Sequence, residues 1–419
     1  MLLSHKTTVK LNNNESNIVG HMCYAAYKLW NVCNYERLNH ELLNLPVDYP
    51  GWYYQKKAHK DELWYKQLPS QTAQEVCKLL DKSWKSFFSL KKTGGIENPN
   101  PPGFKRNGIA ITYMQKGVVH ELGSDTVRLT LSKQLKRYMT DTYGICDNYL
   151  YLKNMIFKNM DIIKQIKIYP PVKGESKIIV IYEVPDVTPL PDNGRYLGID
   201  LGLHNLMTCC NTSTGETFIA GRKYLSLCHY YNKEIARVQS QWHSLQSRKG
   251  VKHPKGSKHI SRLYEKKNNA INDYLHKVTR AVVTYCRDND INTVVIGDIT
   301  NIRKDNNLGH VTNQQFHALP YRKLYIMLEY KLALEGIVLI KQPENYSSQT
   351  SPLAPEVDKD HACSKNRVKR GLYTDNNAVW NADCVGAFNI VRLFLKKHKI
   401  AIKPDPMAMQ SPYILKVAV

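Results

Sequence analysis

No stretch of this sequence approaches the roughly 18 consecutive apolar residues that a membrane-spanning helix needs. The N-terminus, MLLSHKTTVKLNNNES, also lacks the basic segment and long apolar run of a secretory signal. The ten cysteines show no regular spacing, which argues against a disulfide framework and favours reduced thiols. We therefore expect a cytoplasmic protein with no membrane partner.

Acidic residues are scarce relative to basic ones, with 36 Asp and Glu against 59 Lys and Arg and a formal net charge of +23. Such an excess creates a positive field, whose commonest partner is a phosphate polyanion. We recognise no Ser, His and Asp or Cys and His arrangement of a nucleophilic enzyme. With 419 residues the chain has room for two or three domains, and nucleic acid is the expected partner.

The N-terminal half changes texture from helical to strand-like. Apolar residues recur every three or four positions in 17–38 and again in 70–92, where Ser70 is the expected N-cap. A Pro-rich connector, IENPNPPGFKR, follows, and short alternating runs such as TVRLTLS and SKIIVIYEV dominate from about residue 109 to 184. This pattern predicts a helical segment inserted into a strand-built module.

The C-terminal half begins after the linker PDVTPLPDNGR and has a regular element order. We expect strands at 196–202, 204–210 and 217–221, a helical region at 221–280, a strand at 291–298, a helix at 321–335, a strand at 337–342 and a helix from 381. Three strands followed by helix, strand, helix, strand and helix is the order of the ribonuclease H-like fold.

Three aspartates fall at the element ends that this fold would bring together. Asp200 lies in LGIDLG at the end of the first strand, Asp298 ends VVIGD, and Asp383 lies in the first turn of the last helix, where the helix dipole favours a carboxylate. Each alone could be a turn former or a cap. Together they match the oxygen ligands that two hard cations need for phosphodiester cleavage, so we expect all three to be catalytic metal ligands.

At these residues the sequence resembles a known family. GIDLG, VVIGDI and NADCVGAFNI are similar to the three RuvC motifs of TnpB, the RNA-guided nucleases of insertion sequences that are related to small type V CRISPR effectors. LPSQTAQEVCKLLDKSWKSFFSLKK, PPGFKR and YLHKVTRAVV resemble further segments of that family. The resemblance covers the chain from about residue 20 to 395.

The resemblance implies an α+β multidomain protein. Its parts would be an N-terminal β-barrel wedge domain (1–15 and 96–190) with an inserted helical recognition domain (16–95), a RuvC (ribonuclease H-like) α/β nuclease domain with motifs I and II (191–345), a lid that meets the target nucleic acid (346–380), the motif III helix (381–400) and a C-terminal tail (401–419).

The resemblance also implies an activity. A guide RNA made from flanking sequence would bind the protein, the protein would read a short flanking motif in double-stranded DNA, and one RuvC site would cut both strands with two Mg²⁺ ions or with Mn²⁺. The setting would be the cytoplasm of a prokaryote, in association with the nucleoid, and we favour a monomer.

The second motif departs from the family, which usually has Glu where this chain has Gly297. A shift of one residue turns a strand side chain to the other face, but Gly297 eases a bend at the strand end, and we expect Asp298 to substitute. If it does not, the protein is a guided DNA binder without cleavage, similar to a repressor. A transposase that joins strands itself and a plain basic RNA-binding protein are further alternatives.

The segment before the third motif also departs from many relatives, which carry a four-cysteine zinc module there. This chain has no Cys-x-x-Cys pair in 345–384, only His361, Cys363 and Cys384. Zinc needs about four N or S ligands, so we expect no structural zinc.

Candidate nucleic-acid contacts come from basic and aromatic residues. Residues 221–280 hold fourteen Lys and Arg against three acids, which is too lopsided for a face of alternating charges and favours contact with the guide–target duplex. The candidates there are Lys252, Lys255, Lys258, Lys266 and Lys267. In the N-terminal half they are Tyr53, Tyr54 and Trp64 for flanking DNA and Lys105 and Arg106 for RNA backbone, and in the lid they are Arg367, Lys369 and Arg370.

Overall fold

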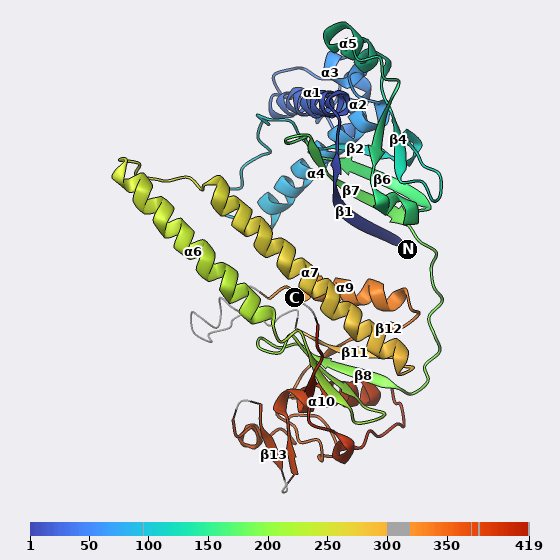
Figure 1. The fold of residues 1–419 in the computed structure, drawn as a ribbon, viewed down its shortest axis with the longest axis vertical. Coiled ribbons are helices and arrows are strands. Elements are labelled where there is room, and N and C mark those ends of the chain that lie inside the picture. Colours follow the sequence, from blue (N-terminus) through green and yellow to red (C-terminus); the bar gives the residue numbers. More distant parts are fainter. Residues whose placement is uncertain (95, 300–318, 370, 376–377, 418–419) are drawn as a thin grey trace. The chain divides into compact units, whose positions relative to one another are not determined.

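The computed structural model describes residues 1–419 except 95, 300–318, 370, 376–377 and 418–419 (Figure 1). The chain divides into two compact units, Met1–Asp186 and Val187–Val419. Among the described helices, none combines the length and apolar character that crossing a membrane requires. The chain is thus a mixed α/β protein of more than one unit.

The first unit contains two antiparallel sheets. One has the strand order β1-β7-β6-β2 and the other the order β3-β4-β5. Their bounds are β1 (Leu2–Lys10), β2 (Ile111–Met114), β3 (Val118–Val119), β4 (Thr126–Thr130), β5 (Tyr149–Lys153), β6 (Ile162–Ile168) and β7 (Glu175–Glu183). No ladder joins the edge strands β1 and β2 within the described residues, so the expected β-barrel is not closed.

The helices of the first unit mostly lie between β1 and β2 in sequence. They are α1 (Asn13–Leu38), α2 (Trp52–Ala58), α3 (Leu63–Lys66) and α4 (Ser70–Thr93), while α5 (Lys133–Tyr143) follows β4 and the short 3₁₀ turns are η1 (Gln115–Gly117) and η2 (Met155–Asn159). A capping box between Asn12 and Glu15 starts α1. Ser70 is the first residue of α4 and does not cap it, because Pro69 takes the cap position.

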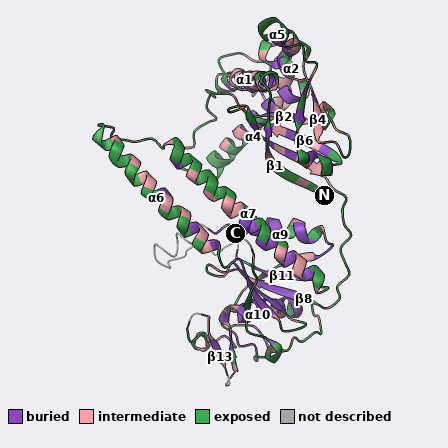
Figure 2. Cartoon of the chain, viewed as in Figure 1, coloured by how far each residue is buried: buried purple, intermediate pink, exposed green. Residues whose placement is uncertain are grey.

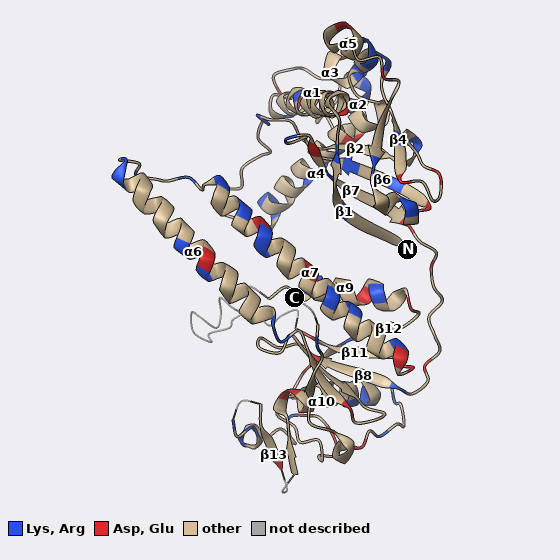
Figure 3. Cartoon of the chain, in the orientation of Figure 1, with Lys and Arg blue, Asp and Glu red and all other residues tan. Residues whose placement is uncertain are grey.

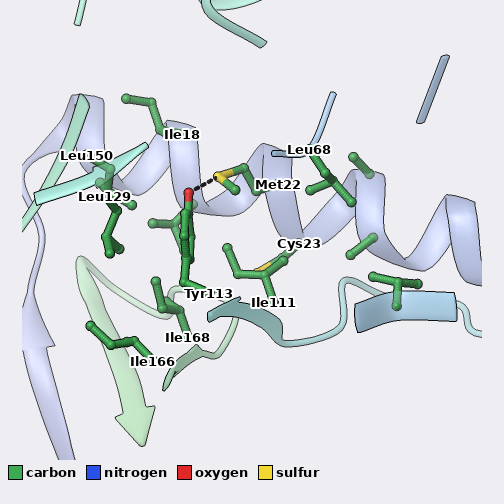
Figure 4. Packing of buried hydrophobic residues seen from close by; sticks show 14 of the residues in the cluster. Ile18, Met22, Cys23, Leu68, Ile111, Tyr113, Leu129, Leu150, Ile166 and Ile168 are labelled. Atoms are coloured by element: carbon green, nitrogen blue, oxygen red, sulfur yellow. Dashed lines mark hydrogen bonds between the residues drawn. The ribbon is translucent and has the colours of Figure 1, made fainter. Parts of the chain in front are cut away.

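The core of the first unit joins the long helix α1 to both sheets. Tyr113 of β2 is fully buried there, and its hydroxyl donates to the Thr130 carbonyl at 2.9 Å and lies 3.5 Å from the Met22 sulfur (Figure 4). A buried tyrosine needs such a partner because a lone polar group in an apolar core is costly. The inserted helices therefore share one core with the strands.

The second unit is built on a six-stranded sheet with the order β12-β11-β8-β9-β10-β15. The strands are β8 (Tyr196–Asp200), β9 (Met207–Asn211), β10 (Thr217–Ala220), β11 (Thr293–Asp298), β12 (Val338–Pro343) and β15 (Tyr413–Ile414). β8, β9 and β10 form an antiparallel meander, and β11 pairs in parallel with both β8 and β12. The expected order of strands is confirmed, and β15, from the predicted tail, adds an edge.

Helices cover both faces of this sheet. They are α6 (Tyr224–Arg248), α7 (Lys258–Asp288), α9 (Tyr321–Ala333) and α10 (Ala382–Lys397), with the smaller elements η3 (Ser364–Asn366), β13 (Tyr373–Asp375), β14 (Ala378–Trp380) and η4 (Pro406–Ala408). Residues from α7 and α9 pack with Leu197 and Ile199 of β8. Residues from α10 pack with Tyr196 of β8 and Val295 of β11. Successive strand residues therefore face different helices.

The predicted helical region 221–280 is a hairpin of two helices, α6 and α7, and the two helices are colored yellow-green and yellow in Figure 1. The break falls in KGVKHPKGS, where Gly250 has a φ of 77° and Ser257 caps α7. Much of the hairpin away from the sheet is exposed (Figure 2).

Candidate metal centre and nucleic-acid interface

Asp200 ends β8 on the face that α10 covers. A Cβ atom on Gly198 would fall 2.1 Å from the Ala387 carbonyl oxygen, and one on Gly386 would fall 2.6 Å from Asp200 Oδ2. Glycine at both positions lets the strand and helix backbones approach closely. The carboxylate of Asp200 therefore lies directly against the first turns of α10.

Asp383 lies on the same side of α10, one turn before Ala387. The Asn381 side chain caps the helix by accepting hydrogen bonds from the backbone N–H groups of Asp383 at 3.0 Å and Cys384 at 3.3 Å. The Asp383 carboxylate accepts from Asn205 Nδ2 at 2.9 Å and forms an ion pair with Arg367 at 3.2 Å. The structure thus brings two of the three predicted aspartates together.

Electrostatics also tie these two aspartates to a third acid that the sequence analysis missed, Glu344. Burial raises the pKa of Asp200 well above its usual value, and the negative charges of Glu344 and Asp383 raise it further. The positive charge of Arg367 opposes this rise in pKa. Glu344 and Asp383 therefore both lie close enough to Asp200 for their charges to repel its carboxylate.

Asp298 does not join this group in the way we expected. In β11, Val294 and Ile296 pack with the core under α7 and α9, whereas Val295 packs with α10. The strand keeps its register to its end, with Gly297 opposite Gln342 and Asp298 opposite Pro343. Because side chains alternate, Asp298 shares the α9 face with Ile296, and its charge acts on Tyr325 of α9. The bend that was to turn Asp298 toward Asp200 is absent.

Glu344 follows β12 and reaches the place that a side chain at position 297 would fill. An ideal Cβ on Gly297 would lie 1.7 Å from Glu344 Oε1. The one signal in the sequence was an acid just beyond a buried strand, in IVLIKQPE. That signal did not reveal which acid the fold would bring to Asp200.

Oxygen donors of this kind suit Mg²⁺. In the part of the chain that the structure describes, no three His, Cys, Asp or Glu side chains already converge as a metal-ligand group. The Arg367 guanidinium forms an ion pair with Asp383, and its positive charge also acts on Asp200, so one positive side chain lies near both acids. A buried carboxylate that two nearby acids repel and a positive side chain stabilises is expected at a site for a hard cation.

The predicted contacts on the α6–α7 hairpin lie at its surface. Lys252, Lys255, Lys258 and Lys266 are exposed, and Figure 3 shows basic residues along both helices. Lys267 is half-buried and donates to Asn232 Oδ1 at 2.6 Å. Four of the five lysines are therefore accessible to a phosphate backbone.

The predicted aromatic contacts in the first unit differ in exposure. Tyr53 is 63% exposed, and its ring lies 3.9 Å from that of Trp52. Tyr54 is half-buried. Trp64 packs edge-on against Tyr24 at 5.4 Å and against the core. Tyr53 is thus the most accessible stacking surface of the three.

The remaining predicted contacts lie in two loops. Asn31 holds the backbone of Lys105 through hydrogen bonds of 2.7 and 2.9 Å, and the Lys105 ammonium lies 4.6 Å from the Trp30 ring centroid. Arg106 and Lys369 are exposed. Arg370 lies outside the described residues.

Parts of the chain are similar to known protein families and to a named relative. Residues 179–303 match the family model OrfB_IS605, described as a probable transposase, and residues 321–390 match the Cas12f1-like TNB domain. A relative from Escherichia coli (strain K12), named "Putative RNA-guided DNA endonuclease InsQ", is 25% identical over 373 residues, which cover 84% of this chain and 82% of the relative.

Solved structures resemble the chain more distantly. A chain of the Cas12f1–sgRNA–target DNA complex is 14% identical, with 93% of this chain and 98% of that chain covered and a TM-score of 0.37. The mini-RNA-guided endonuclease CRISPR-Cas_phi3 is 10% identical, with 94% and 92% covered and a TM-score of 0.45. The two family models and the InsQ relative agree with the resemblance of the motifs around Asp200 and Asp383 to the TnpB family.

Proposed function

We propose that this protein is an RNA-guided, Mg²⁺-dependent DNA endonuclease. The observation that carries the proposal is the alignment, over most of both chains, with a relative named as an RNA-guided DNA endonuclease. The meeting of Asp200 and Asp383 under α10 supports it, because metal-dependent phosphodiester cleavage needs carboxylates that lie close together.

The parts of the chain take the roles that the family suggests. Residues 191–345 with the helix 381–400 form the RuvC nuclease domain, 346–380 the lid, and 401–419 a tail that adds β15 to the sheet. The wedge (1–15 and 96–190) and the inserted helices (16–95) hold guide RNA and read the flanking DNA motif. The wedge in this proposal is an open pair of sheets.

Each residue of the site has a task in this proposal. When bound, Mg²⁺ would activate water and stabilise the leaving oxygen of the scissile phosphate. Asp200 and Asp383 would hold the ion, and Asn205 orients the Asp383 carboxylate through its 2.9 Å hydrogen bond. Arg367 forms an ion pair with Asp383 and would offer its remaining N–H groups to phosphate.

The charge of the protein suits guide and target. Base pairing carries the sequence information in guided recognition, so the protein needs a positive channel and few base contacts. A net charge of +23 and the exposed lysines of the α6–α7 hairpin supply phosphate contacts. The proposed partners are one guide RNA and double-stranded DNA, bound by a monomer in the prokaryotic cytoplasm and nucleoid.

The alternative of a guided binder without cleavage is not favoured. Its motivation was the absence of a Glu at position 297, and that space contains the Glu344 carboxylate. An acid is therefore present in the space where the alternative assumed that an acid was missing.

The test co-expresses the protein with its flanking genomic sequence, sequences the RNA that co-purifies, and adds a matching plasmid library with Mg²⁺. Asp200→Asn and Asp383→Asn are the site variants, and Glu329→Gln, an exposed acid of α9, is the control. We expect cuts beside one short motif, lost in both site variants and kept in the control. Motif-dependent binding without any cut would refute the nuclease, and no specific RNA would refute guided recognition.

A further inference from the structure

We infer that Glu344 supplies the third metal-binding carboxylate of this site, from the end of β12, in the space left by Gly297 of β11. The inference rests on the proposed function and deepens it by naming the acid that completes the site. It also removes Asp298 from the metal ligands, where the sequence alone had placed it.

The Glu344 carboxyl group fills the space next to Gly297. A Cβ atom on Gly297 would lie 1.7 Å from Oε1, 2.5 Å from Cδ and 2.8 Å from Cγ of Glu344. Real Cβ atoms do not approach other atoms so closely, so the Glu344 carboxyl group occupies the volume where any side chain at 297 would begin. A side chain at position 297 would therefore displace the Glu344 carboxyl group from the place it occupies.

The register of the sheet puts Glu344 on the same face as Gly297. β11 and β12 are parallel, with Gly297 opposite Gln342. Glu344 lies two residues beyond Gln342, which returns its side chain to the face of Gly297. Val295, two residues before Gly297, contacts the α10 cluster on that face. The face is the one on which Asp200 meets α10.

The Glu344 carboxyl group has a buried oxygen that finds no partner among the described residues. Its Oε1 accepts no hydrogen bond from them, and the same is true of Oε1 of Gln342, two residues earlier, whose side chain is only 5% exposed. Buried polar atoms are normally satisfied, so two unpartnered acceptors beside one another point to a bound donor or cation.

Asp298 and Asp200 lie on opposite faces of the sheet. Asp298 follows Ile296 in β11 on the face that α9 covers, whereas Asp200 meets α10 on the other face. Asp298 is exposed at the surface on the α9 face. It therefore influences the site from outside and does not line it.

The test measures metal binding directly, by titrating the purified full-length protein with Mn²⁺ and following free Mn²⁺ by electron paramagnetic resonance. Glu344→Gln is expected to weaken Mn²⁺ binding at least about tenfold, as loss of a ligand should exceed the effect of an outer group. Asp298→Asn is expected to change it less than about threefold, because that acid faces α9, and Glu329→Gln serves as the matched surface control.

A relocation variant guards against misfolding. Glu344→Gly combined with Gly297→Glu moves the acid from β12 to β11 and removes the steric conflict in one step. We expect this double variant to regain Mn²⁺ binding that Glu344→Gly alone has lost. Circular dichroism establishes that each variant is folded before it is titrated.

The outcomes separate this inference from the proposed function. If Glu344→Gln binds Mn²⁺ like the wild type while Asp298→Asn does not, the inference is overturned and the nuclease proposal stands. If Asp200→Asn also binds Mn²⁺ unchanged, the metal site itself is wrong and the proposed function falls with it.

Discussion

Replacing Glu344 with Gln should stabilise the metal-free protein at alkaline pH. The folded-state pKa of Glu344 is raised from 4.5 to about 7, chiefly by burial and then by the charge of Asp298. A carboxyl group whose pKa is raised on folding stabilises the fold while it is protonated. That stability is present below the unfolded value of 4.5 and is lost as the pH rises through about 7.

The magnitude follows from the size of the pKa change. A rise from 4.5 to about 7 corresponds to roughly 3 kcal/mol at pH 8, and because Glu344 is partly exposed we expect about 2 kcal/mol. Gln is nearly isosteric and stays neutral, so the variant escapes this cost. At pH 5 most wild-type Glu344 is protonated in the fold, and the difference should fall below about 1 kcal/mol.

Thermal unfolding of the full-length protein in EDTA, at pH 5 and pH 8, measures the difference, with Glu329→Gln as the control. Saturating Mg²⁺ should reverse the order at pH 8, because a ligand that binds only the folded state stabilises it and the variant binds Mg²⁺ weakly. The reasoning is refuted if Glu344→Gln is less stable than the wild type in EDTA at pH 8, or if the gain is the same at both pH values.

Three further changes test other parts of the fold. Gly198→Ala should destabilise the second unit by about 3 kcal/mol, because the new Cβ would lie 2.1 Å from a backbone carbonyl oxygen of α10. Gly256→Ala is the control, since a Cβ there has open space. Thermal unfolding compares the two variants, and equal stability would contradict the close approach. Lys331 is buried, which lowers its pKa to about 8, so the folded protein loses this proton at a lower pH than the unfolded chain does. The free energy of unfolding of the wild type, measured by urea titration, should therefore rise by about 2 kcal/mol between pH 8 and 10.5, and that of Lys331→Met should not change. Arg37→Met removes the buried partner that lies 3.0 Å from Asp81 and should lower the free energy of unfolding of the first unit by about 3 kcal/mol, as measured by hydrogen exchange. Adding Asp81→Leu should recover part of this lost stability. If the double variant recovers none, the ion pair does not have the role described.

The order of strands and helices in the second unit could be read from sequence, because each element has strong local signals. Asp200 ends an apolar strand, and Asp383 follows the N-cap Asn381 in the first turn of a helix. These signals act over a few residues, so the sequence was enough to assign both aspartates to element ends that a ribonuclease H-like order brings together.

The closure of the first unit could not be read in the same way. Alternating runs predicted strands correctly, but whether a sheet closes depends on pairing between strands far apart in sequence. β1 pairs with β7 across most of the unit, and the edges β1 and β2 stay unjoined in the described residues. Likewise, β15 depends on a partner far away in sequence, because residues 413–414 pair in parallel with β10.

The sequence by itself determined that the chain is basic, that it resembles one family in three motifs in order, and that Asp200 ends a strand while Asp383 lies in the first turn of a helix. Only the tertiary structure decided which further acid faces them. Asp298 is adjacent to the family position in sequence but on the other face of the sheet, whereas Glu344 is distant in sequence and fills the space beside Gly297. The reason is physical: neighbours along a strand point to opposite faces, and neighbours across two parallel strands share one.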